Sequence, residues 1–272
     1  MYVHCRDPRN VEETHAFALT SIQRLFTCQF SKLHPTVRKN LWKNVKTPAA
    51  RSVMRSCTHM TGSTQLCISE LEQFCLKSDT RILKTIRLTM DLVETLMDVL
   101  PNMKVIHLNR DPRGMTNSRL NGPFRMARHL YNHTRDTCAR MQNDIDYNNQ
   151  LKHVYTDRLI TVLYEALAER PYDGAEYIYK FLKLDIKWQM IYWVFNSTHS
   201  DNTYYFSTSR SNAVASAYRW RKEMKYDDVK LIDRLCVKTY SMLGILPVET
   251  EDVLRNIDLP TRQSIQHFDG FI

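Results

Sequence analysis

Short apolar runs alternate with helix-like segments through the middle of this chain. Residues 104–108 and 158–164 are compact runs rich in Val, Ile and Leu, which is typical of buried strands. Residues 91–100 and 173–182 carry apolar side chains at helical spacing, and Pro101 ends the first of these helices. The alternation predicts an α/β fold, a parallel sheet with helices on both faces. Such sheets bind ligands at the carboxyl ends of their strands.

The segments that flank this core give weaker patterns. Apolar positions predict a helix within residues 10–30, whereas the basic stretch 31–65 predicts an irregular covering loop. Residues 69–74 predict a short helix, and the β-branched content of residues 81–88 predicts a further strand. Residues 226–243 again show helical spacing and predict the last helix.

Residues 185–225 have no clear period and are rich in Trp, Tyr, Asn, Ser and Arg. We therefore expect long loops or a substrate-side lobe there. Aromatic residues gather in this region, at Tyr192, Trp193 and 204–206. Such rings can stack against sugars, but we expect them to pack in a core or under a lid.

The most informative segment follows the first predicted strand. The run Lys104-Val-Ile-His-Leu-Asn delivers Arg110 to the sheet edge where ligands bind. Asp111 can accept hydrogen bonds from the free amides of a new helix, and Pro112 suits its first position because no N–H is needed there. Ser118 follows Arg110 by eight residues, about two helical turns, which directs its hydroxyl toward the same anion.

Two interpretations of this segment stay open from spacing alone. In the functional one, Arg110 and Ser118 bind an anion, and Arg113 and Arg119 add positive potential. In the structural one, Arg110 pairs with a carboxylate and Ser118 is an ordinary surface serine.

The formal net charge of +9 favours an anionic partner. Nucleotide, nucleic acid, acidic glycan and membrane surface all satisfy this condition. Nucleic acid is disfavoured, because the basic residues are dispersed and no zinc-finger or RRM signature is present. No apolar run approaches the roughly 18 to 20 residues of a membrane span, and the first residues contain no apolar signal core.

Seven cysteines show no CxxC and no metal-ligand spacing, so we do not expect a metal site. Five of them precede residue 80, and this clustering suits disulfides in an oxidising compartment, with buried thiols in a cytosolic protein as the alternative. Asn132 and Asn196 begin sequons that permit glycosylation in the same compartment. The cysteines lie at positions 5, 28, 57, 67, 75, 138 and 236.

The segment from Lys104 to Arg119 resembles the 3'-phosphate-binding motif of sulfotransferases that use phosphoadenosine phosphosulfate (PAPS). In that motif a strand is followed by Arg-Asp-Pro-Arg and, eight residues after the first Arg, by a Ser. The resemblance assigns the 3'-phosphate of the donor to Arg110 and Ser118. The sequence Lys-Val-Ile-His-Leu-Asn-Arg-Asp-Pro-Arg is most similar to that of Golgi carbohydrate sulfotransferases that act on galactose or N-acetylglucosamine.

Two further stretches resemble the same family. Lys84-Thr-Ile-Arg is similar to a strand whose Lys stabilises the transferring sulfonate, which implies that role for Lys84. Cytosolic members carry a catalytic His where this chain has Ile86, so the base here stays unassigned. Tyr164 matches a Tyr that packs near the adenine of the donor, and Ala166 replaces the Asp of that stretch.

The resemblance implies a P-loop-NTPase-like three-layer fold with a central parallel sheet. We expect one sulfotransferase-like domain over residues 1–272. Within it, residues 1–75 would form a helix and Cys-containing covering loops, 76–185 the nucleotide-binding core, and 186–272 substrate-side loops and a C-terminal helix. Family members bind the 5'-phosphosulfate with a Gly/Ser-rich loop after the first strand. The sequence contains no such loop, so we expect the N-terminal strand and loop to be missing from this chain.

The function that the resemblance implies is sulfonate transfer from PAPS to a hydroxyl of a glycan or glycosaminoglycan, with no metal. The chain would be an incomplete form, and the alternative is a non-catalytic relative that binds nucleotide or glycan. The expected partner is a glycan acceptor and not nucleic acid. The expected location is the Golgi lumen or membrane, through an anchor that this chain lacks. Several of Cys28, Cys57, Cys67 and Cys75 would then be paired.

Overall fold

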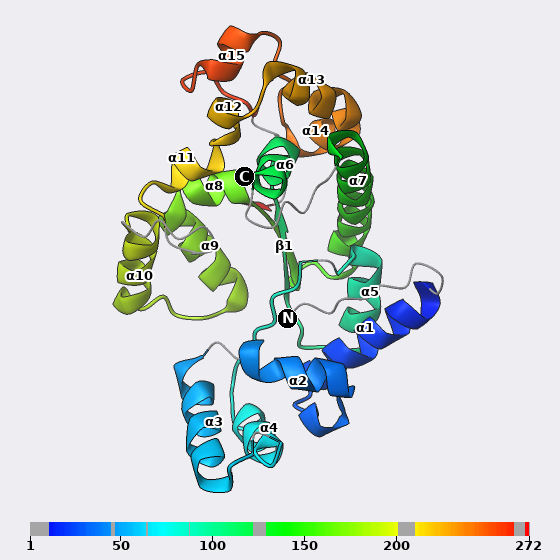
Figure 1. Cartoon of the computed structure of the whole chain (residues 1–272), viewed down its shortest axis with the longest axis vertical. Coiled ribbons are helices and arrows are strands. Elements are labelled where there is room, and N and C mark those ends of the chain that lie inside the picture. The colour runs from blue at the N-terminus through cyan, green and yellow to red at the C-terminus, as the bar shows by residue number, and fades with distance from the viewer. Residues whose placement is uncertain are drawn as a thin grey trace. The chain divides into compact units, whose positions relative to one another are not determined.

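The computed structural model describes residues 11–44, 47–63, 65–86, 88–121, 129–200, 210–263 and 270–271. The chain has a mixed α/β structure with a small parallel sheet, and it divides into two compact units, Met1–Pro101 and Asn102–Ile272 (Figure 1). The boundary lies inside the segment 76–185 that was expected to form the nucleotide-binding core. The expectation of a single domain stays a prediction.

Helices make up most of the first unit. The expected helices within 10–30, at 69–74 and at 91–100 are confirmed. The helical elements are α1 (Val11–Phe26), the short 3₁₀ helix η1 (Phe30–Lys32), α2 (Pro35–Asn44), α3 (Pro48–Thr61), α4 (Ile68–Leu76) and α5 (Met90–Val99).

The prediction of an irregular loop over 31–65 is wrong, because α2 and α3 occupy most of it. The basic residues of this stretch made the helical spacing of the apolar residues in α3 difficult to recognise. Thr47 accepts a hydrogen bond from the Ala50 amide at 3.4 Å, Pro48 takes the first helical position, and Gly62 ends the helix in a left-handed conformation. Met54 is buried on the same face as Ala50, so α3 packs by an apolar stripe.

The strand predicted over 81–88 is also wrong. Residues 81–86 have no regular structure, and Ile82 is 87% exposed, so the β-branched side chains are not buried against a sheet. Arg81 instead donates hydrogen bonds to the Cys75 carbonyl at 3.2 Å and to the Phe26 carbonyl at 3.3 Å. These contacts fix the start of the segment to the ends of α4 and α1.

Among the described residues, two disulfides lie in the first unit and one in the second. Cys28 pairs with Cys75 and Cys57 with Cys67, which confirms the expected pairing among these four residues. In the second unit, Cys138 pairs with Cys236, a bond that the sequence analysis did not assign. The remaining cysteine of the expected cluster, Cys5, lies outside the described residues.

The second unit contains the sheet and the remaining helices. Both predicted strands are confirmed within one residue at each end, as β1 (Val105–Asn109) and β2 (Leu159–Leu163), and a short third strand β3 (Gly270–Phe271) follows. The order is β1-β2-β3 with parallel pairing throughout. The helices are α6 (Pro112–Leu120), α7 (Leu130–Val154), α8 (Tyr164–Glu169), α9 (Pro171–Leu182), α10 (Trp188–Thr198), α11 (Ala213–Ala217), α12 (Trp220–Glu223), α13 (Tyr226–Leu235), α14 (Val237–Leu243) and α15 (Glu251–Arg255).

Helices cover both faces of β2, as the alternation of strands and helices predicts. On one face, Asn148 of α7 donates a hydrogen bond to the Thr161 hydroxyl at 2.9 Å. On the other, Val162 packs in an apolar cluster with Tyr177 and Ile178 of α9. Successive residues of a strand point to opposite faces, so α7 and α9 lie on opposite sides of the sheet, as Figure 1 shows.

The region 185–225, expected to form long loops or a substrate-side lobe, contains the helices α10 to α12 in its described part. Core packing was also wrong for Tyr192 and Trp193, which are 60% and 56% exposed on α10. The other aromatic residues of that group, 204–206, lie outside the described residues. The helix expected over 226–243 is present, but it is interrupted at Cys236 into α13 and α14.

None of the helices in the described ranges combines the length and the apolar character needed to cross a membrane.

Candidate anion-binding pocket

The register of the sheet places two predicted site residues side by side. Asn109 of β1 pairs with Leu163 of β2, so the residues that follow, Arg110 and Tyr164, leave the sheet at the same edge. The guanidinium carbon of Arg110 lies 4.5 Å from the centre of the Tyr164 ring. This is a cation–π contact at the carboxyl ends of parallel strands, where α/β sheets bind ligands.

The first turn of α6 is capped as predicted. The Asp111 carboxylate accepts a hydrogen bond from the Arg113 amide at 2.8 Å, and Pro112 takes the first helical position. The Asp111 amide in turn donates to the Glu165 carboxylate at 3.1 Å. The start of α6 is therefore tied to the first turn of α8.

Gly114 lets the Arg110 side chain lie close to α6. A Cβ atom at this position would be 3.3 Å from Arg110 Nε, which is tighter than an ordinary van der Waals contact. One turn further on, the Ser118 hydroxyl donates to the Gly114 carbonyl at 2.9 Å. Arg110, Gly114 and Ser118 thus follow one another along the same side of the helix.

A pocket of about 270 Å³ lies over this side of α6. Arg110, Ser118 and Tyr164, the three residues that the sequence assigned to the nucleotide, all line it. The full lining consists of Arg110, Gly114, Asn117, Ser118, Asn121, Tyr164, Arg210, Ser216, Arg219, Trp220 and Glu223.

The lining carries more positive than negative charge. Arg110, Arg210 and Arg219 contribute cations, whereas Glu223 is the acidic residue among the lining residues. Glu223 accepts a hydrogen bond from Asn117 at 2.7 Å and lies 3.8 Å from Arg219. Arg110 Nε is buried and has no hydrogen-bond partner in the part of the chain that the structure describes. A donor-rich pocket with an unpaired guanidinium N–H suits an anion.

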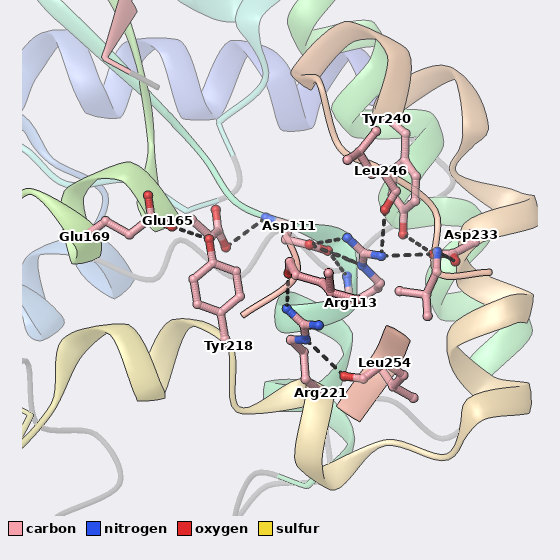
Figure 2. Close-up of polar contacts among 12 residues, drawn as sticks. Asp111, Arg113, Glu165, Glu169, Tyr218, Arg221, Asp233, Tyr240, Leu246 and Leu254 are labelled. Carbon is pink, nitrogen blue, oxygen red and sulfur yellow. Dashed lines mark hydrogen bonds and ion pairs between the residues drawn. The ribbon is translucent and has the colours of Figure 1, made fainter. Parts of the chain in front are cut away.

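Arg113 does not add positive potential to this pocket, contrary to the sequence prediction. Its guanidinium is fully buried and donates to Asp111 at 2.7 and 3.0 Å and to the Leu246 carbonyl at 3.1 Å, as Figure 2 shows. It also forms an ion pair with Asp233 of α13 at 3.4 Å. Burial alone would lower the pKa of Arg113, but Asp111 and Asp233 outweigh it and raise the pKa above its usual range. Arg113 is therefore a structural link between α6 and α13.

Arg221 has a similar structural role. Its buried guanidinium donates to the Leu254 carbonyl at 3.0 Å, as Figure 2 shows, and to the Val253 carbonyl at 2.6 Å, both near the end of α15. It also donates to the Leu259 carbonyl, beyond this helix, at 2.8 Å. It provides donors for the carbonyl groups that are unpaired at a helix C-terminus. Arg119, the other residue expected to add charge, donates to the Thr137 hydroxyl of α7 at 3.3 Å and does not line the pocket.

Glu165 is a fully buried carboxyl group behind the pocket. Burial and, to a smaller extent, the neighbouring Asp111 raise its pKa to about 7, although Arg110 opposes both effects. One carboxylate oxygen accepts from the Asp111 amide, and the other has no hydrogen-bond partner in the described ranges. The protonation of Glu165 therefore depends on the charges of Arg110 and Asp111, which begin the anion-binding segment.

Lys84 belongs to the first unit, where it is exposed in the irregular segment 81–86. Its role in sulfonate transfer stays a prediction. Within the described parts of the chain, no group of three or more His, Cys, Asp or Glu side chains is arranged to hold a metal ion.

Sequence reasoning missed Arg210, Arg219 and Trp220 as lining residues. The available signal was the run Arg219-Trp-Arg221, in which two guanidinium groups flank a large aromatic ring. The segment has no hydrophobic period, because α11 and α12 are only five and four residues long. The pattern could not show which of its side chains face the pocket.

Comparison with known proteins gives a consistent result. The sulfotransferase family matches residues 6–189 of this chain. Carbohydrate sulfotransferase 1 of Mus musculus is 28% identical over 219 residues, which is 74% of this chain and 53% of that protein. Carbohydrate sulfotransferase 1 of Danio rerio is 28% identical over 224 residues, 75% of this chain and 52% of the relative.

Carbohydrate sulfotransferase 6 of Homo sapiens is 28% identical over 189 residues, covering 62% of this chain and 48% of the relative. The chain spans about half the length of the curated relatives it matches. No solved structure matches it.

Proposed function

Because the chain belongs to the sulfotransferase family, we propose that it binds PAPS through Arg110 and Ser118 and transfers the sulfonate to a hydroxyl group of a glycan. The observation that carries the proposal is the shared pocket of Arg110, Ser118 and Tyr164. Its donor-rich lining fits the 3'-phosphate of the donor, and the Tyr164 ring beside Arg110 offers a surface for the adenine.

In this reaction an oxygen of the acceptor hydroxyl bonds to sulfur as the bond from sulfur to the bridging phosphate oxygen breaks. Adenosine 3',5'-bisphosphate leaves, and the hydroxyl proton passes to a base that is unassigned. Negative charge spreads over the sulfonate oxygens, where a positioned cation lowers the barrier. We assign that role to Lys84 by its resemblance to the family's lysine.

The proposal includes a P-loop-like three-layer fold, a glycan acceptor and a Golgi location. A glycan acceptor is supported by the relatives, which are named as carbohydrate sulfotransferases. The disulfides of the first and second units support an oxidising compartment, because such bonds persist outside the cytosol.

Calorimetry on the purified chain tests the nucleotide site. Adenosine 3',5'-bisphosphate should bind more tightly than adenosine 5'-monophosphate. Arg110→Ala should lose about 1.5 to 3 kcal/mol of binding free energy for the bisphosphate, the range for hydrogen bonds to charged groups. Arg135→Ala is the matched control, because Arg135 is exposed and pairs with Asp136 outside the pocket. Equal affinity of wild type and Arg110→Ala for the bisphosphate would contradict the proposed site.

A non-catalytic nucleotide- or glycan-binding protein is the second candidate, since the sequence contains no Gly/Ser-rich phosphosulfate loop. A donor labelled in the sulfonate group separates the two functions. Transfer of the label to a galactose- or N-acetylglucosamine-containing acceptor, and its loss in Lys84→Ala, would support the enzyme. Bisphosphate binding without any transfer would support the binding protein.

A further inference from the structure

Trp220 presents a buried hydrogen-bond donor without a partner. The side chain is fully buried, and its Nε1 atom makes no hydrogen bond within the described residues. The indole N–H can only donate, so it needs an acceptor. Buried polar groups are almost always paired, and an exception next to a pocket points to a group that binds there.

The edge of the ring that carries this donor lies next to Gly114, another residue of the pocket lining. Cδ1, the ring carbon bonded to Nε1, lies 3.4 Å from the position that a Cβ atom on Gly114 would take. Arg110 Nε lies 3.3 Å from the same position. Arg110 Nε and the Cδ1–Nε1 edge of the Trp220 ring therefore both lie close to Gly114, and both side chains line the pocket.

The indole ring packs with one face against the Arg113 guanidinium. The guanidinium carbon of Arg113 lies 4.2 Å from the ring centre, and Arg113 is itself fixed by its ion pair with Asp111. The ring therefore does not need to reorient when a ligand enters, and a donor held in place loses little entropy on binding.

We propose that Trp220 donates its indole N–H to the phosphate that Arg110 holds, and so contributes to the selection of nucleotides phosphorylated at the 3' position. This inference rests on the proposed nucleotide-binding function. The terminal oxygens of a phosphate accept hydrogen bonds, so one such group can receive bonds from Arg110 and Trp220 together. A ribose hydroxyl is uncharged and forms weaker bonds with the same donors.

Trp220→Phe tests the proposal, because it removes the N–H and retains an aromatic ring beside Arg113. The measured quantity is the ratio of affinities for adenosine 3',5'-bisphosphate and adenosine 5'-monophosphate. Loss of packing affects both nucleotides, whereas loss of the N–H affects only the bisphosphate. We expect the ratio to fall about tenfold or more, as for a hydrogen bond to a charged group. An unchanged ratio overturns the role of Trp220.

A second measurement leaves Trp220 itself in place. In protein labelled with ¹⁵N, each of the four tryptophans gives one indole N–H signal, and selective labelling with replacement of the other three identifies Trp220. The Trp220 signal should move downfield on addition of the bisphosphate and stay in place with the monophosphate. A signal that responds equally to both nucleotides contradicts the proposal.

The same experiments separate this inference from the proposed function. If Arg110→Ala reduces the ratio and Trp220→Phe does not, the role of Trp220 is wrong and the nucleotide site stands. If the wild-type chain itself shows no preference for the bisphosphate, the proposed function fails and this inference fails with it.

Discussion

Arg110 and Tyr164 are brought together by strand register, although 53 residues separate them in the sequence. Each follows the last residue of a parallel strand, and the Arg110 guanidinium carbon lies 4.5 Å from the centre of the Tyr164 ring. The backbone hydrogen bonds of two paired strands hold this geometry before any ligand arrives. Two residues of the pocket thus stand directly after paired strands, and regular elements position site residues more precisely than loops do.

Removing the Tyr164 ring should weaken nucleotide binding modestly. Tyr164→Leu loses the cation–π contact, worth about 0.5 to 1 kcal/mol at a partly exposed site, so affinity for adenosine 3',5'-bisphosphate should fall about two- to fivefold. Tyr164→Phe retains the ring and should bind nearly as well as wild type. Calorimetry on both variants measures the effect, and equal losses in the two would show that the hydroxyl matters instead of the ring.

Gly114→Ala should weaken nucleotide binding without lowering stability. Alanine favours a helix over glycine by up to about 1 kcal/mol, so the melting temperature should stay the same or rise. The added Cβ would crowd Arg110 Nε and Trp220 Cδ1, so bisphosphate affinity should drop severalfold. The control is the double variant with Arg110→Ala, in which Gly114→Ala should have a much smaller effect on affinity. Full additivity of the two losses would argue against crowding of Arg110.

Arg113→Met should destabilise the second unit strongly. The substitution leaves Asp111 and Asp233 buried without their cation, and breaking a buried pair from one side costs about 3 to 5 kcal/mol. Urea denaturation measures this loss in the free energy of unfolding. Arg135→Met, which breaks the exposed pair with Asp136, should change it by about 1 kcal/mol or less. A small effect for both variants would mean that the buried pair contributes little.

Glu165 should make the free energy of unfolding depend on pH. Its pKa is about 7 in the folded chain against an ordinary 4.5, so between these values the folded state holds a proton that the unfolded state has released. The contribution of Glu165 to stability therefore falls as pH rises from about 4.5 to 7. The charged groups that face it are Asp111, which strengthens the shift, and Arg110, which opposes it.

Glu165→Gln removes this titration and keeps an oxygen that can accept from the Asp111 amide. Denaturation series from about pH 4.5 to pH 8 should show wild type losing stability relative to Glu165→Gln as pH rises through that window. Other titrating groups affect both proteins alike, so the difference isolates residue 165. A constant difference across the series would show that Glu165 does not titrate there.

The parts of the fold that the sequence predicted correctly are those with strong local signals. β1 and β2 are compact apolar runs, and α6 begins at an Asp-Pro pair that caps it. The segment 81–88 has the composition of a strand, but strand formation needs a paired neighbour and a buried face, and Ile82 has neither in the described structure. Composition reports a preference, whereas pairing is decided by tertiary structure.

The candidate site was predictable to the same degree. Arg110, Ser118 and Tyr164 are near recognisable motifs and line one pocket. Arg113 belongs to the same motif, yet it does not line the pocket, because its side chain binds Asp233 instead. This partner lies 120 residues further along the sequence. Trp220 reaches the pocket from a four-residue helix without any period. Contacts between residues so far apart in the sequence cannot be predicted from the spacing of residues within one segment.

The Cys138–Cys236 bond sets an order of events during synthesis. The two cysteines are 98 residues apart, and Asp233, Arg219 and Trp220 all lie in the second part of that interval. At about 5 to 20 residues per second, a ribosome needs roughly 5 to 20 seconds to add this stretch. Until it has emerged, Arg113 lacks one of its acidic partners and the pocket lacks one wall. The growing chain therefore holds an incomplete binding site until Cys236 has been added, and only then can oxidation join this residue to Cys138.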